Sequence, residues 1–454
     1  MDIKELYSIF KDCSRVTTDS RAIEGGELFF GLKGENFDGN EYAVKALEAG
    51  ASYAVVNEDS EAAKSGDGRI IPVPDTLEAL QELARYHREN TFVDGKRLTV
   101  IGLTGTNGKT TTKELITRVL SMKYKVTATQ GNLNNDIGVP LSVLAIDGST
   151  ELAVIEMGAS HPEDISKLVK VCEPDYGLIT NVGRAHLLGF GSFEGVKMAK
   201  GRLYDYVSTH GGRIFLNADD PDLTEMAEER GITDPIKYGI GYWDAIVLPS
   251  SAEHPYLRMA IPVLRQAQQP QEPEEEGETL IGVETHLAGA YNATNVAAAI
   301  AVGLHFGVSL EQAVEAVSSY VPKNNRSQME RTEKNILIKD LYNANPSSMA
   351  AALDNLVLAE AEKKVALLGD MRELGDESIN EHRKVLNQLL SMGLDLVCLV
   401  GDEFGKVAEG KEAVKCFATS EDLAAWLKEN PVSGATILVK GSRGIKMETV
   451  LPEL

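Results

Sequence analysis

The sequence predicts an α/β protein of three domains: a small α/β domain, a larger parallel-sheet domain and a Rossmann-like domain. The chain has 454 residues, enough for roughly two to four domains of ordinary size. Short apolar runs alternate with helical patterns along the chain, as is typical of α/β folds. Polar turns or prolines separate three blocks, so we expect domains at residues 1–96, 97–321 and 322–454.

The first block reads as a small α/β unit. Residues 27–32 and 52–56 are short apolar runs of the length and composition that strands have. Residues 42–49 have a helical pattern that ends at Gly50, because glycine is favoured just beyond a helix. The polar turn at residues 93–96 marks the boundary to the second block.

The second block repeats strand and helix. Residues 153–156, 176–180 and 213–216 are nearly continuous apolar runs, which indicates strands buried on both faces of a parallel sheet. Helices should therefore cover that sheet. Residues 266–278 carry two prolines and three consecutive glutamates, so we expect a solvated loop there.

The third block again alternates strands and helices, as a doubly wound Rossmann-like domain does. It lacks the Gly-x-Gly-x-x-Gly fingerprint, so no dinucleotide is assigned to it. The expected strands are residues 336–338, 364–368, 396–400 and 436–439.

The most informative segment runs from Val100 to Thr112: an apolar strand, a glycine-rich turn, a lysine and three threonines. Glycines let backbone N–H groups turn toward an anion, and the helix N-terminus adds its positive dipole end. Lys109 would reach the outer phosphates of ATP, while Thr110 or Thr111 would hold Mg²⁺. The nucleotide-binding residues expected here are Gly105, Thr106, Asn107, Gly108, Lys109, Thr110 and Thr111.

This segment departs from the common P-loop pattern. Leu103 stands where the first glycine would be, so the motif reads Thr-Gly-Thr-Asn-Gly-Lys-Thr. A glycine-rich turn without a ligand is the alternative. That alternative leaves the lysine and three hydroxyls at a helix start unexplained.

Two later strands bring polar side chains to the same edge of the sheet. Glu156 ends an apolar strand, at the edge where open α/β sheets bind ligands, and is a candidate Mg²⁺ ligand. A solvated carboxylate is the alternative. His186 follows the next strand. Alone, it would more often be structural or solvated, but beside Glu156 at the same sheet edge it is a candidate functional residue. The spacing of Lys200 does not distinguish it from a solvated helix lysine.

Several loops gather amides or charges. Residues 129–140 contain three asparagines, which suggests recognition of a polar ligand, although turn chemistry accounts for some of them. In residues 291–295, a helix-capping role is the alternative to ligand contact. Residues 340–346 follow a strand and collect a carboxylate, an aromatic ring and amides, so we expect ligand contact. The turns at 369–375 and 440–444 suit ligand contact and loop geometry equally well.

Composition narrows the function classes. Hydrophobic residues make up 43% and charged residues 25% of the chain, and the net charge is −23. No block of Lys and Arg offers a surface for nucleic acid or an anionic membrane. The N-terminus lacks an apolar signal core, and no segment has the ~18 apolar residues that span a bilayer. We expect a cytoplasmic protein without stable membrane insertion, whose four widely spaced cysteines stay reduced.

These motifs together resemble the Mur ligase family, from end to end of the chain. The resemblance implies an N-terminal domain that holds a UDP-sugar, a central ATPase and a C-terminal domain that closes over the site. The segments that carry it are residues 18–21, 26–39, 104–112, 131–140, 156–160, 185–192, 342–349, 368–375 and 440–442.

The resemblance also implies roles for individual residues. Lys109 would contact ATP phosphates, Thr110 or Thr111 with Glu156 would hold Mg²⁺, and His186 would serve a second metal region. Lys200 matches the lysine that this family carbamylates, which would give Mg²⁺ an oxygen ligand. Arg202 departs from the family, because relatives commonly carry an acid there. Nucleotide contacts are implied for Asn292, Asn295, Arg326, Asp340, Tyr342 and Asn343, and substrate contacts for Ser20, Arg21, Lys33, Asn36, Asp38, Asn134, Asn135 and Ser160.

The implied activity is ATP-driven amide formation that adds D-alanyl-D-alanine to UDP-N-acetylmuramoyl-tripeptide, through an acyl phosphate, in cytoplasmic peptidoglycan precursor synthesis. We expect a monomer with ATP and Mg²⁺ as cofactors. The alternatives are a ligase of the same architecture, either the enzyme that adds the third peptide residue or a folylpolyglutamate synthetase. A nucleotide switch protein is the alternative of another class; it predicts slow hydrolysis that no amine stimulates.

Overall fold

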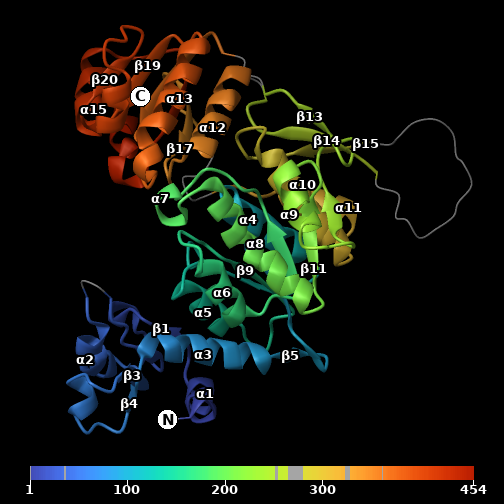
Figure 1. Ribbon diagram of the computed structural model, residues 1–454, viewed down its shortest axis with the longest axis vertical. Helices are drawn as coiled ribbons and strands as arrows, with labels where there is room; N and C mark the ends of the chain where they lie inside the picture. Colours follow the sequence, from blue (N-terminus) through green and yellow to red (C-terminus); the bar gives the residue numbers. More distant parts are fainter. Residues whose placement is uncertain (1, 35–36, 251–253, 264–279, 323–327, 360) are drawn as a thin grey trace, which may run out of the picture.

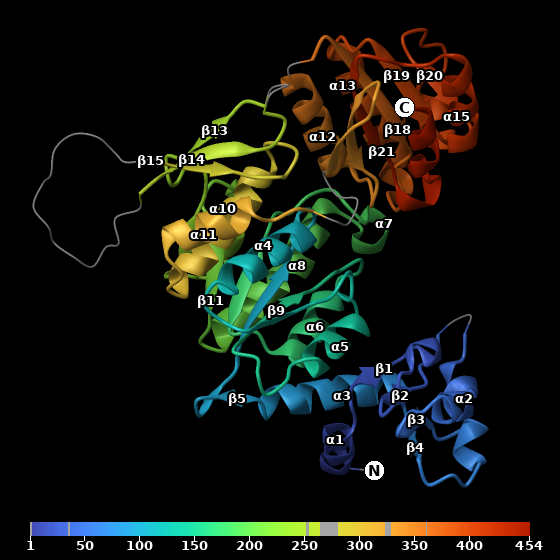
Figure 2. The same ribbon diagram turned by 180° about the vertical axis from the view of Figure 1, so that it is seen from behind.

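The computed structural model describes residues 2–34, 37–250, 254–263, 280–322, 328–359 and 361–454. Three units follow one another along the long axis of the molecule (Figure 1), and the view from behind shows the same order (Figure 2). The expected three-unit α/β architecture is confirmed. The predicted contacts Asn36 and Arg326, and the expected loop at 266–278, lie outside the described residues.

The N-terminal unit holds a four-stranded parallel sheet in the order β1-β2-β3-β4. The two predicted strands appear as β2 and β3, and the predicted helix ends as expected before Gly50, whose φ is +114°. The elements are β1 (Val16–Thr17), β2 (Leu28–Phe30), β3 (Tyr53–Asn57), β4 (Ile70–Val73), α1 (Ile3–Asp12), α2 (Ala43–Glu48), α3 (Thr76–Glu89), η1 (Ser20–Ala22), η2 (Gly39–Tyr42) and η3 (Ala62–Lys64).

Helix α3 lies between the N-terminal and central units (Figure 1). Asp75 caps its start, accepting hydrogen bonds from the backbone N–H of Leu77 and Glu78. The buried side chains of Leu80 and Leu83 belong to one hydrophobic cluster that also contains residues of the central unit. The polar turn at residues 93–96 joins a small hairpin, β5 (Phe92–Val93) and β6 (Lys96–Arg97), just after this helix.

The central unit holds a six-stranded parallel sheet in the order β12-β11-β10-β7-β9-β8. Its elements are β7 (Thr99–Thr104), α4 (Lys109–Leu120), β8 (Val126–Ala128), α5 (Gly138–Leu144), β9 (Leu152–Glu156), α6 (Asp164–Cys172), β10 (Tyr176–Ile179), α7 (Leu187–Phe190), α8 (Phe193–Thr209), β11 (Arg213–Asn217), α9 (Pro221–Glu228) and β12 (Ile236–Tyr238).

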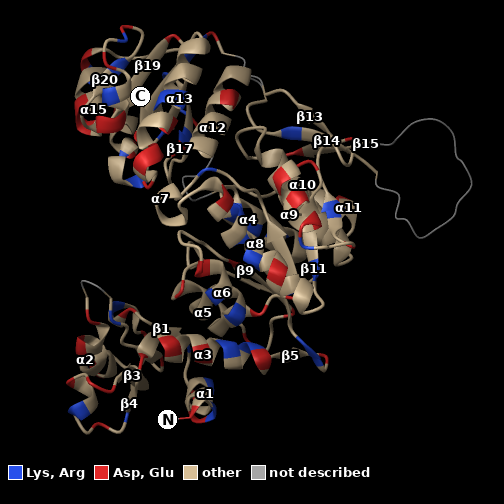
Figure 3. Cartoon of the chain, in the orientation of Figure 1, with Lys and Arg blue, Asp and Glu red and all other residues tan. Residues whose placement is uncertain are grey.

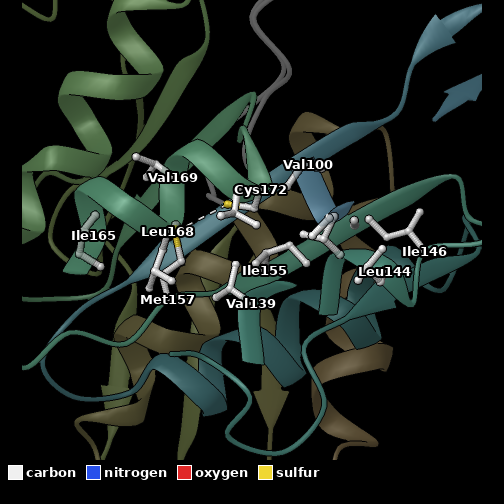
Figure 4. Packing of buried hydrophobic residues seen from close by; sticks show 14 of the residues in the cluster. Val100, Val139, Leu144, Ile146, Ile155, Met157, Ile165, Leu168, Val169 and Cys172 are labelled. Carbon is white, nitrogen blue, oxygen red and sulfur yellow. Dashed lines mark hydrogen bonds between the residues drawn. The ribbon is translucent and has the colours of Figure 1, made fainter. Parts of the chain in front are cut away.

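Helices cover both faces of this sheet, as its apolar strands predict. Val100 and Ile155 point to the face covered by α5 and α6, where Figure 4 shows them among buried aliphatic side chains. Ile101 and Val154 point to the opposite face, which α4 covers. The register pairs Leu103 of β7 with Glu156 of β9 and with Leu178 of β10, so these three strands end together.

One part of the central unit was not predicted. A three-stranded antiparallel sheet follows β12, with the order β13-β14-β15. Sequence analysis expected strand–helix repeats up to residue 321, but antiparallel neighbours need no helical crossover. The elements are β13 (Ile246–Leu248), β14 (Arg258–Pro262), β15 (Leu280–Glu284), α10 (Asn292–His305) and α11 (Leu310–Ser318).

The C-terminal unit is a six-stranded sheet in the order β16-β17-β21-β18-β19-β20, antiparallel only at β16. Its two faces carry separate hydrophobic clusters, as a doubly wound sheet requires. The elements are β16 (Gln328–Arg331), β17 (Ile336–Asp340), α12 (Pro346–Leu358), β18 (Lys363–Gly369), η4 (Gly375–Glu377), α13 (Ser378–Ser391), β19 (Leu396–Val400), α14 (Asp402–Val407), β20 (Lys415–Phe417), α15 (Ser420–Glu429), β21 (Ala435–Lys440), η5 (Arg443–Ile445) and η6 (Met447–Glu453).

The distribution of charged residues agrees with the mixed charge composition of the sequence. Lys and Arg are interspersed with Asp and Glu on all three units (Figure 3). Within the described part of the chain, no helix has the length and apolar character needed to cross a membrane. Cys13, Cys172, Cys398 and Cys416 are free thiols.

Candidate active site

A cavity of about 680 Å³ lies between the P-loop side of the central unit and the C-terminal unit. It brings together residues from the ends of five strands, β7, β9, β10, β17 and β21, and from two units. The predicted site residues that line it are Thr106, Asn107, Gly108, Lys109, Thr111, Asn134, Asn135, Glu156, Ser160, His186, Asn292, Asn295, Asp340, Tyr342 and Asn343.

Four predicted substrate contacts do not line this cavity. Ser20, Arg21, Lys33 and Asp38 belong to the N-terminal unit. Arg21 forms a salt bridge with Asp19 at 2.8 Å, and the Lys33 ammonium lies 3.9 Å from the Asp38 carboxylate. Any contact of these side chains with substrate would therefore be to a part of it that extends away from the cavity.

The turn before α4 requires its glycines. Gly105 has φ +152°, and a Cβ there would lie 1.9 Å from Thr180 Oγ1. Gly108 has φ +78°, and a Cβ there would lie 2.6 Å from Asn295 Oδ1. Both positions therefore combine a backbone conformation that side chains disfavour with a close approach.

Residues at the end of β10 form hydrogen bonds with the same turn. Thr180 Oγ1 donates to the Asn107 carbonyl oxygen at 2.6 Å, and the Asn107 N–H donates to Asn181 Oδ1 at 3.0 Å. Sequence analysis did not select Asn181. The signal was available, because Asn181 follows a strand that ends at the same sheet edge as the turn.

The turn has the properties of an anion site. Helix α4 begins at Lys109, so its first N–H groups and positive dipole end face the cavity side. Lys109 Nζ donates to the carbonyl oxygens of Gly105 at 2.8 Å and Thr106 at 3.0 Å. A polyphosphate placed here would meet a lysine ammonium and backbone donors together.

Glu156 is fully buried at the end of β9. Its Oε1 accepts hydrogen bonds from Asn134 Nδ2 at 2.7 Å and from Thr110 Oγ1 at 3.3 Å. Its Oε2 is buried and makes no hydrogen bond within the described part of the chain. A buried carboxylate oxygen without a partner is costly, so Glu156 fits a cation ligand better than the alternative of a solvated carboxylate.

The donors around Glu156 fit Mg²⁺. This ion is usually bound through one or two carboxylates together with substrate phosphates and water. Among the described residues, no three His, Cys, Asp or Glu side chains gather into a metal-binding group. Thr111 lines the cavity. The Thr110 hydroxyl, however, is the one that contacts the Glu156 carboxylate, and this contact favours Thr110 as the second protein ligand.

Lys200 lies behind the turn, on α8, with its side chain buried. Its Nζ donates to the Gly105 carbonyl oxygen at 3.0 Å, the same oxygen that Lys109 contacts. Burial, and then the nearby charge of Lys109, hold the pKa of Lys200 well below its ordinary value. Burial contradicts the solvated alternative that spacing could not exclude, and it favours a neutral, nucleophilic amine.

His186 follows β10 and lies at the start of α7 in a left-handed backbone conformation, with φ +51°. Its Nδ1 lies 2.6 Å from Glu373 Oε2 of the C-terminal unit. Burial lowers the pKa of His186, as do the charges of Lys109 and Lys200, while Glu373 opposes the shift. The ring is thus a partly buried cavity residue with a carboxylate partner.

The C-terminal unit adds two residues, Asn345 and Lys440, that lie in loops named by sequence analysis but that it did not select individually. Asn345 Nδ2 donates to Asn107 Oδ1 at 2.9 Å, joining this unit to the P-loop. Lys440 is buried, forms an ion pair with Asp340 and donates to the Asn343 carbonyl oxygen at 3.1 Å. Parallel β17 and β21 place Asp340 directly beside Lys440, which a single sequence cannot reveal.

Two predicted asparagines, Asn292 and Asn295, belong to a buried series of hydrogen bonds at the start of α10. Asn295 Nδ2 donates to Asn292 Oδ1 at 2.9 Å, and Thr112 Oγ1 of α4 donates to Asn295 Oδ1 at 3.1 Å. Asn292 does not cap the helix, because Tyr291 is the N-cap and makes no side-chain capping bond. The capping alternative for Asn292 is therefore wrong.

Comparison with known proteins decides the family. Family models match residues 12–88 (Mur ligase family, catalytic domain), 103–303 (Mur ligase middle domain) and 325–443 (Mur ligase, glutamate ligase domain). The UDP-N-acetylmuramoyl-tripeptide–D-alanyl-D-alanine ligase of Bacillus subtilis (strain 168) is 36% identical over 97% of this chain and 92% of its own length. The chain belongs to the Mur ligase family. The enzyme of the same name from Escherichia coli (strain K12) is 33% identical to this Mur ligase over 97% of the chain and 93% of its own length.

Solved structures agree. A crystal structure of MurF from Acinetobacter baumannii matches this Mur ligase with a TM-score of 0.84 at 29% identity, covering 100% of this chain and 98% of that one. A MurF ligase from Thermotoga maritima in complex with ADP matches with a TM-score of 0.82 at 26% identity, covering 98% and 97%. The similarity thus extends over all three units of this Mur ligase.

Proposed function

We propose that this Mur ligase is a UDP-N-acetylmuramoyl-tripeptide–D-alanyl-D-alanine ligase that uses ATP. The observation that carries the proposal is the end-to-end similarity to enzymes of that name, 36% identity over 97% of the chain. The cavity supports it, because one space adjoins a phosphate-binding turn, a buried carboxylate and residues of a second unit. Ligation needs all three, since it joins two substrates at the expense of a nucleotide.

The reaction has two steps. A carboxylate oxygen of the tripeptide attacks the γ-phosphorus of ATP, and the bond to ADP breaks. The amine of D-alanyl-D-alanine then attacks the acyl carbon, phosphate leaves, and the amine loses a proton. Several negative charges meet in the first step, so the contribution of the protein is alignment and electrostatic stabilisation.

The residues divide this work. Lys109 and the N-terminus of α4 hold the β- and γ-phosphates. Glu156 and Thr110 would hold Mg²⁺, which when bound would neutralise phosphate charge. Asn134 orients the Glu156 carboxylate through its 2.7 Å hydrogen bond. Asn292, Asn295, Asp340, Tyr342 and Asn343 provide the nucleotide contacts, and Asn135 and Ser160 face the peptide end of the acceptor.

Lys200 takes part as a carbamate. The neutral amine attacks carbon dioxide, one proton leaves, and the product is an anionic oxygen ligand for the second metal region beside His186. Two lysine nitrogens now share the Gly105 carbonyl oxygen. Carbamylation replaces their repulsion with attraction, because Lys109 then lies near an anion.

The proposed domains are residues 1–96 for the UDP-sugar, 97–321 for ATP and 322–454 for closure. Ser20, Arg21, Lys33 and Asp38 would hold the UDP-sugar end of a substrate long enough to reach the cavity from the N-terminal unit. We propose that the enzyme acts as a monomer in the cytoplasm.

A substrate panel tests the proposal. The purified protein is given ATP and UDP-N-acetylmuramoyl-tripeptide, with diaminopimelate or lysine as the third residue, and each of several amines. We expect phosphate release only with D-alanyl-D-alanine, and mass spectrometry should detect the matching amide. Turnover with a UDP-N-acetylmuramoyl-dipeptide, or with folate and glutamate, would instead identify one of the related ligases. Slow ATP hydrolysis that no amine stimulates would instead favour a nucleotide switch protein.

A further inference from the structure

The C-terminal unit touches the central unit at His186, through the loop that follows β18. Glu373 Oε2 of this loop lies 2.6 Å from His186 Nδ1, and the Leu188 N–H donates to the Glu373 carbonyl oxygen at 3.3 Å. Helix α7, which follows His186, lies at the border of the two units in Figures 1 and 2. Glu373 therefore contacts His186 through its side chain and Leu188 through its backbone.

Both partners have unusual backbones. His186 has φ +51° and Glu373 has φ +64°, a left-handed conformation that few residues other than glycine adopt. Such conformations persist where the surrounding structure determines them, often at functional sites. An ordinary surface ion pair does not require a left-handed backbone conformation in either residue.

The loop that carries Glu373 is held firmly within its own unit. His382 is completely buried, and its Nε2 accepts the Met371 N–H at 3.0 Å. Ser442 Oγ accepts the Arg372 N–H at 2.9 Å. Because both residues before Glu373 are anchored, its carboxylate is presented to His186 by a rigid support.

The contact determines the chemistry of the imidazole. An ionised carboxylate only accepts hydrogen bonds, so the hydrogen between the two groups belongs to His186 Nδ1. In a neutral ring, Nε2 then carries the free lone pair. A carboxylate that fixes a histidine in this way is a recurrent arrangement around metal-binding histidines.

We propose that Glu373 is a positioning residue that holds His186 with Nδ1 protonated and Nε2 available to the cavity. The contact with the C-terminal unit thereby fixes which ring nitrogen of His186 faces the cavity. The consequence for catalysis rests on the proposed function. The tautomer of His186 does not, because it follows from the 2.6 Å contact alone.

Nitrogen-15 NMR of the full-length protein tests the tautomer directly. The protein is labelled in its eight histidines, and His186→Gln assigns the His186 signal. We expect wild-type His186 to show a protonated Nδ1 and an unprotonated Nε2. In Glu373→Ala the two nitrogen shifts should move toward each other, because both tautomers then exchange. Glu373→Gln should keep most of the wild-type pattern, since its amide oxygen also accepts the hydrogen.

Glu377→Ala is the matched control, because Glu377 lies exposed on the same segment, at the N-cap of α13, and makes no side-chain capping bond. It should leave the His186 shifts unchanged. Thermal unfolding of every variant verifies that the fold is intact. Identical His186 shifts in wild type and a folded Glu373→Ala would overturn the proposal.

Steady-state kinetics of amide formation test the consequence. We expect Glu373→Ala to lower kcat at least tenfold with little change in KM for ATP, and Glu373→Gln to recover much of that loss. Normal turnover in a Glu373→Ala variant whose tautomer has changed would refute the role in catalysis. Absence of amide formation by the wild type would count against the proposed function alone, and the NMR result would still decide the role of Glu373.

Discussion

Lys109 and Lys200 direct their nitrogens at one oxygen, the carbonyl of Gly105, at 2.8 and 3.0 Å. Two ammonium groups so close cannot both be stabilised at low dielectric. The buried one, Lys200, is the one whose pKa falls. In this pair, Lys109 supplies the charge that faces the phosphate site, and Lys200 supplies an amine that is able to react.

Lys109→Ala should abolish amide formation without unfolding the protein, because it removes the charge that faces the β- and γ-phosphates. We expect a fall in kcat of roughly 100-fold or more, with unchanged circular dichroism. Lys170→Ala, an exposed lysine on α6, is the control and should behave as wild type. Turnover within about tenfold of wild type, a difference of only ~1.4 kcal/mol, would contradict the phosphate role of Lys109.

Lys200→Ala should be nearly inactive and partly rescued by acetate, because a small carboxylate occupies the vacated space and restores anionic oxygens. Carbon-13 NMR with labelled bicarbonate should show a carbamate signal in wild type that is missing from the variant. Carbamylation consumes the neutral amine, so the signal should weaken as the pH is lowered. A bare amine in wild type, together with normal turnover of Lys200→Ala, would show that the second metal region does not use Lys200.

At the scale of elements, parallel register assembles the site. β7, β9 and β10 end at the same edge, so the P-loop, Glu156 and the Thr180–Asn181 support meet, although Asn107 and Asn181 are 74 positions apart in the sequence. The glycines of the turn are needed because neighbouring strand ends approach it closely. Leu103 replaces the first glycine of the common P-loop pattern. Its side chain is fully buried in the hydrophobic cluster on the face of the sheet that α4 covers.

Gly105→Ala tests this close approach. Its Cβ would lie 1.9 Å from Thr180 Oγ1 at a φ of +152°, so we expect a loss of about 1–3 kcal/mol of stability and much weaker ATP binding. Gly148→Ala is the control, since a Cβ there meets nothing within 4 Å. Calorimetric unfolding and titration with ATP measure the two effects. Equal behaviour of both variants would refute the claim that the turn is tightly enclosed.

At the scale of the whole molecule, α3 joins the first two units. Arg88, near its end, is completely buried. Its guanidinium donates to the Cys172 and Glu173 carbonyl oxygens, each at 3.1 Å, and to Asp175 Oδ2 at 2.8 Å. Asp175 Oδ2 also accepts the Val100 N–H of β7. The proposed boundary at residue 96 therefore follows a helix that is packed into the central unit.

Arg88→Met should destabilise the protein by about 3–5 kcal/mol, because it leaves a carboxylate and two carbonyl groups without their buried partner. Arg85→Met is the control; Arg85 is about half exposed and forms ion pairs with Glu89 at 3.0 Å and with Glu173 at 3.5 Å, so its loss should cost about 1 kcal/mol or less. Denaturant unfolding measures both free energies. A similar small effect of the two substitutions would mean that Arg88 does not couple the units.

Much was determined by the sequence itself, because the relevant signals are local. The apolar runs predicted strands in each of the three units, namely β2, β3, β7, β9, β10, β11, β17, β18, β19 and β21. The glycine-lysine turn predicts a phosphate site, and Glu156 was selected as a candidate Mg²⁺ ligand by its place at a strand end. The family resemblance, which comparison confirms, also came from short contiguous motifs. Each of these depends on residues that are neighbours in the chain.

Only the tertiary structure decided the rest. The spacing of Lys200 in the sequence did not indicate a functional role. Folding nevertheless places its Nζ 3.0 Å from the carbonyl oxygen of Gly105, 95 residues away. Glu373 reaches His186 from another unit, Asp340 meets Lys440 through strand pairing, and antiparallel β13–β15 interrupt the expected repeat. Burial and long-range pairing change the pKa of a lysine or the tautomer of a histidine. Both changes arise only when distant segments of the chain are packed together.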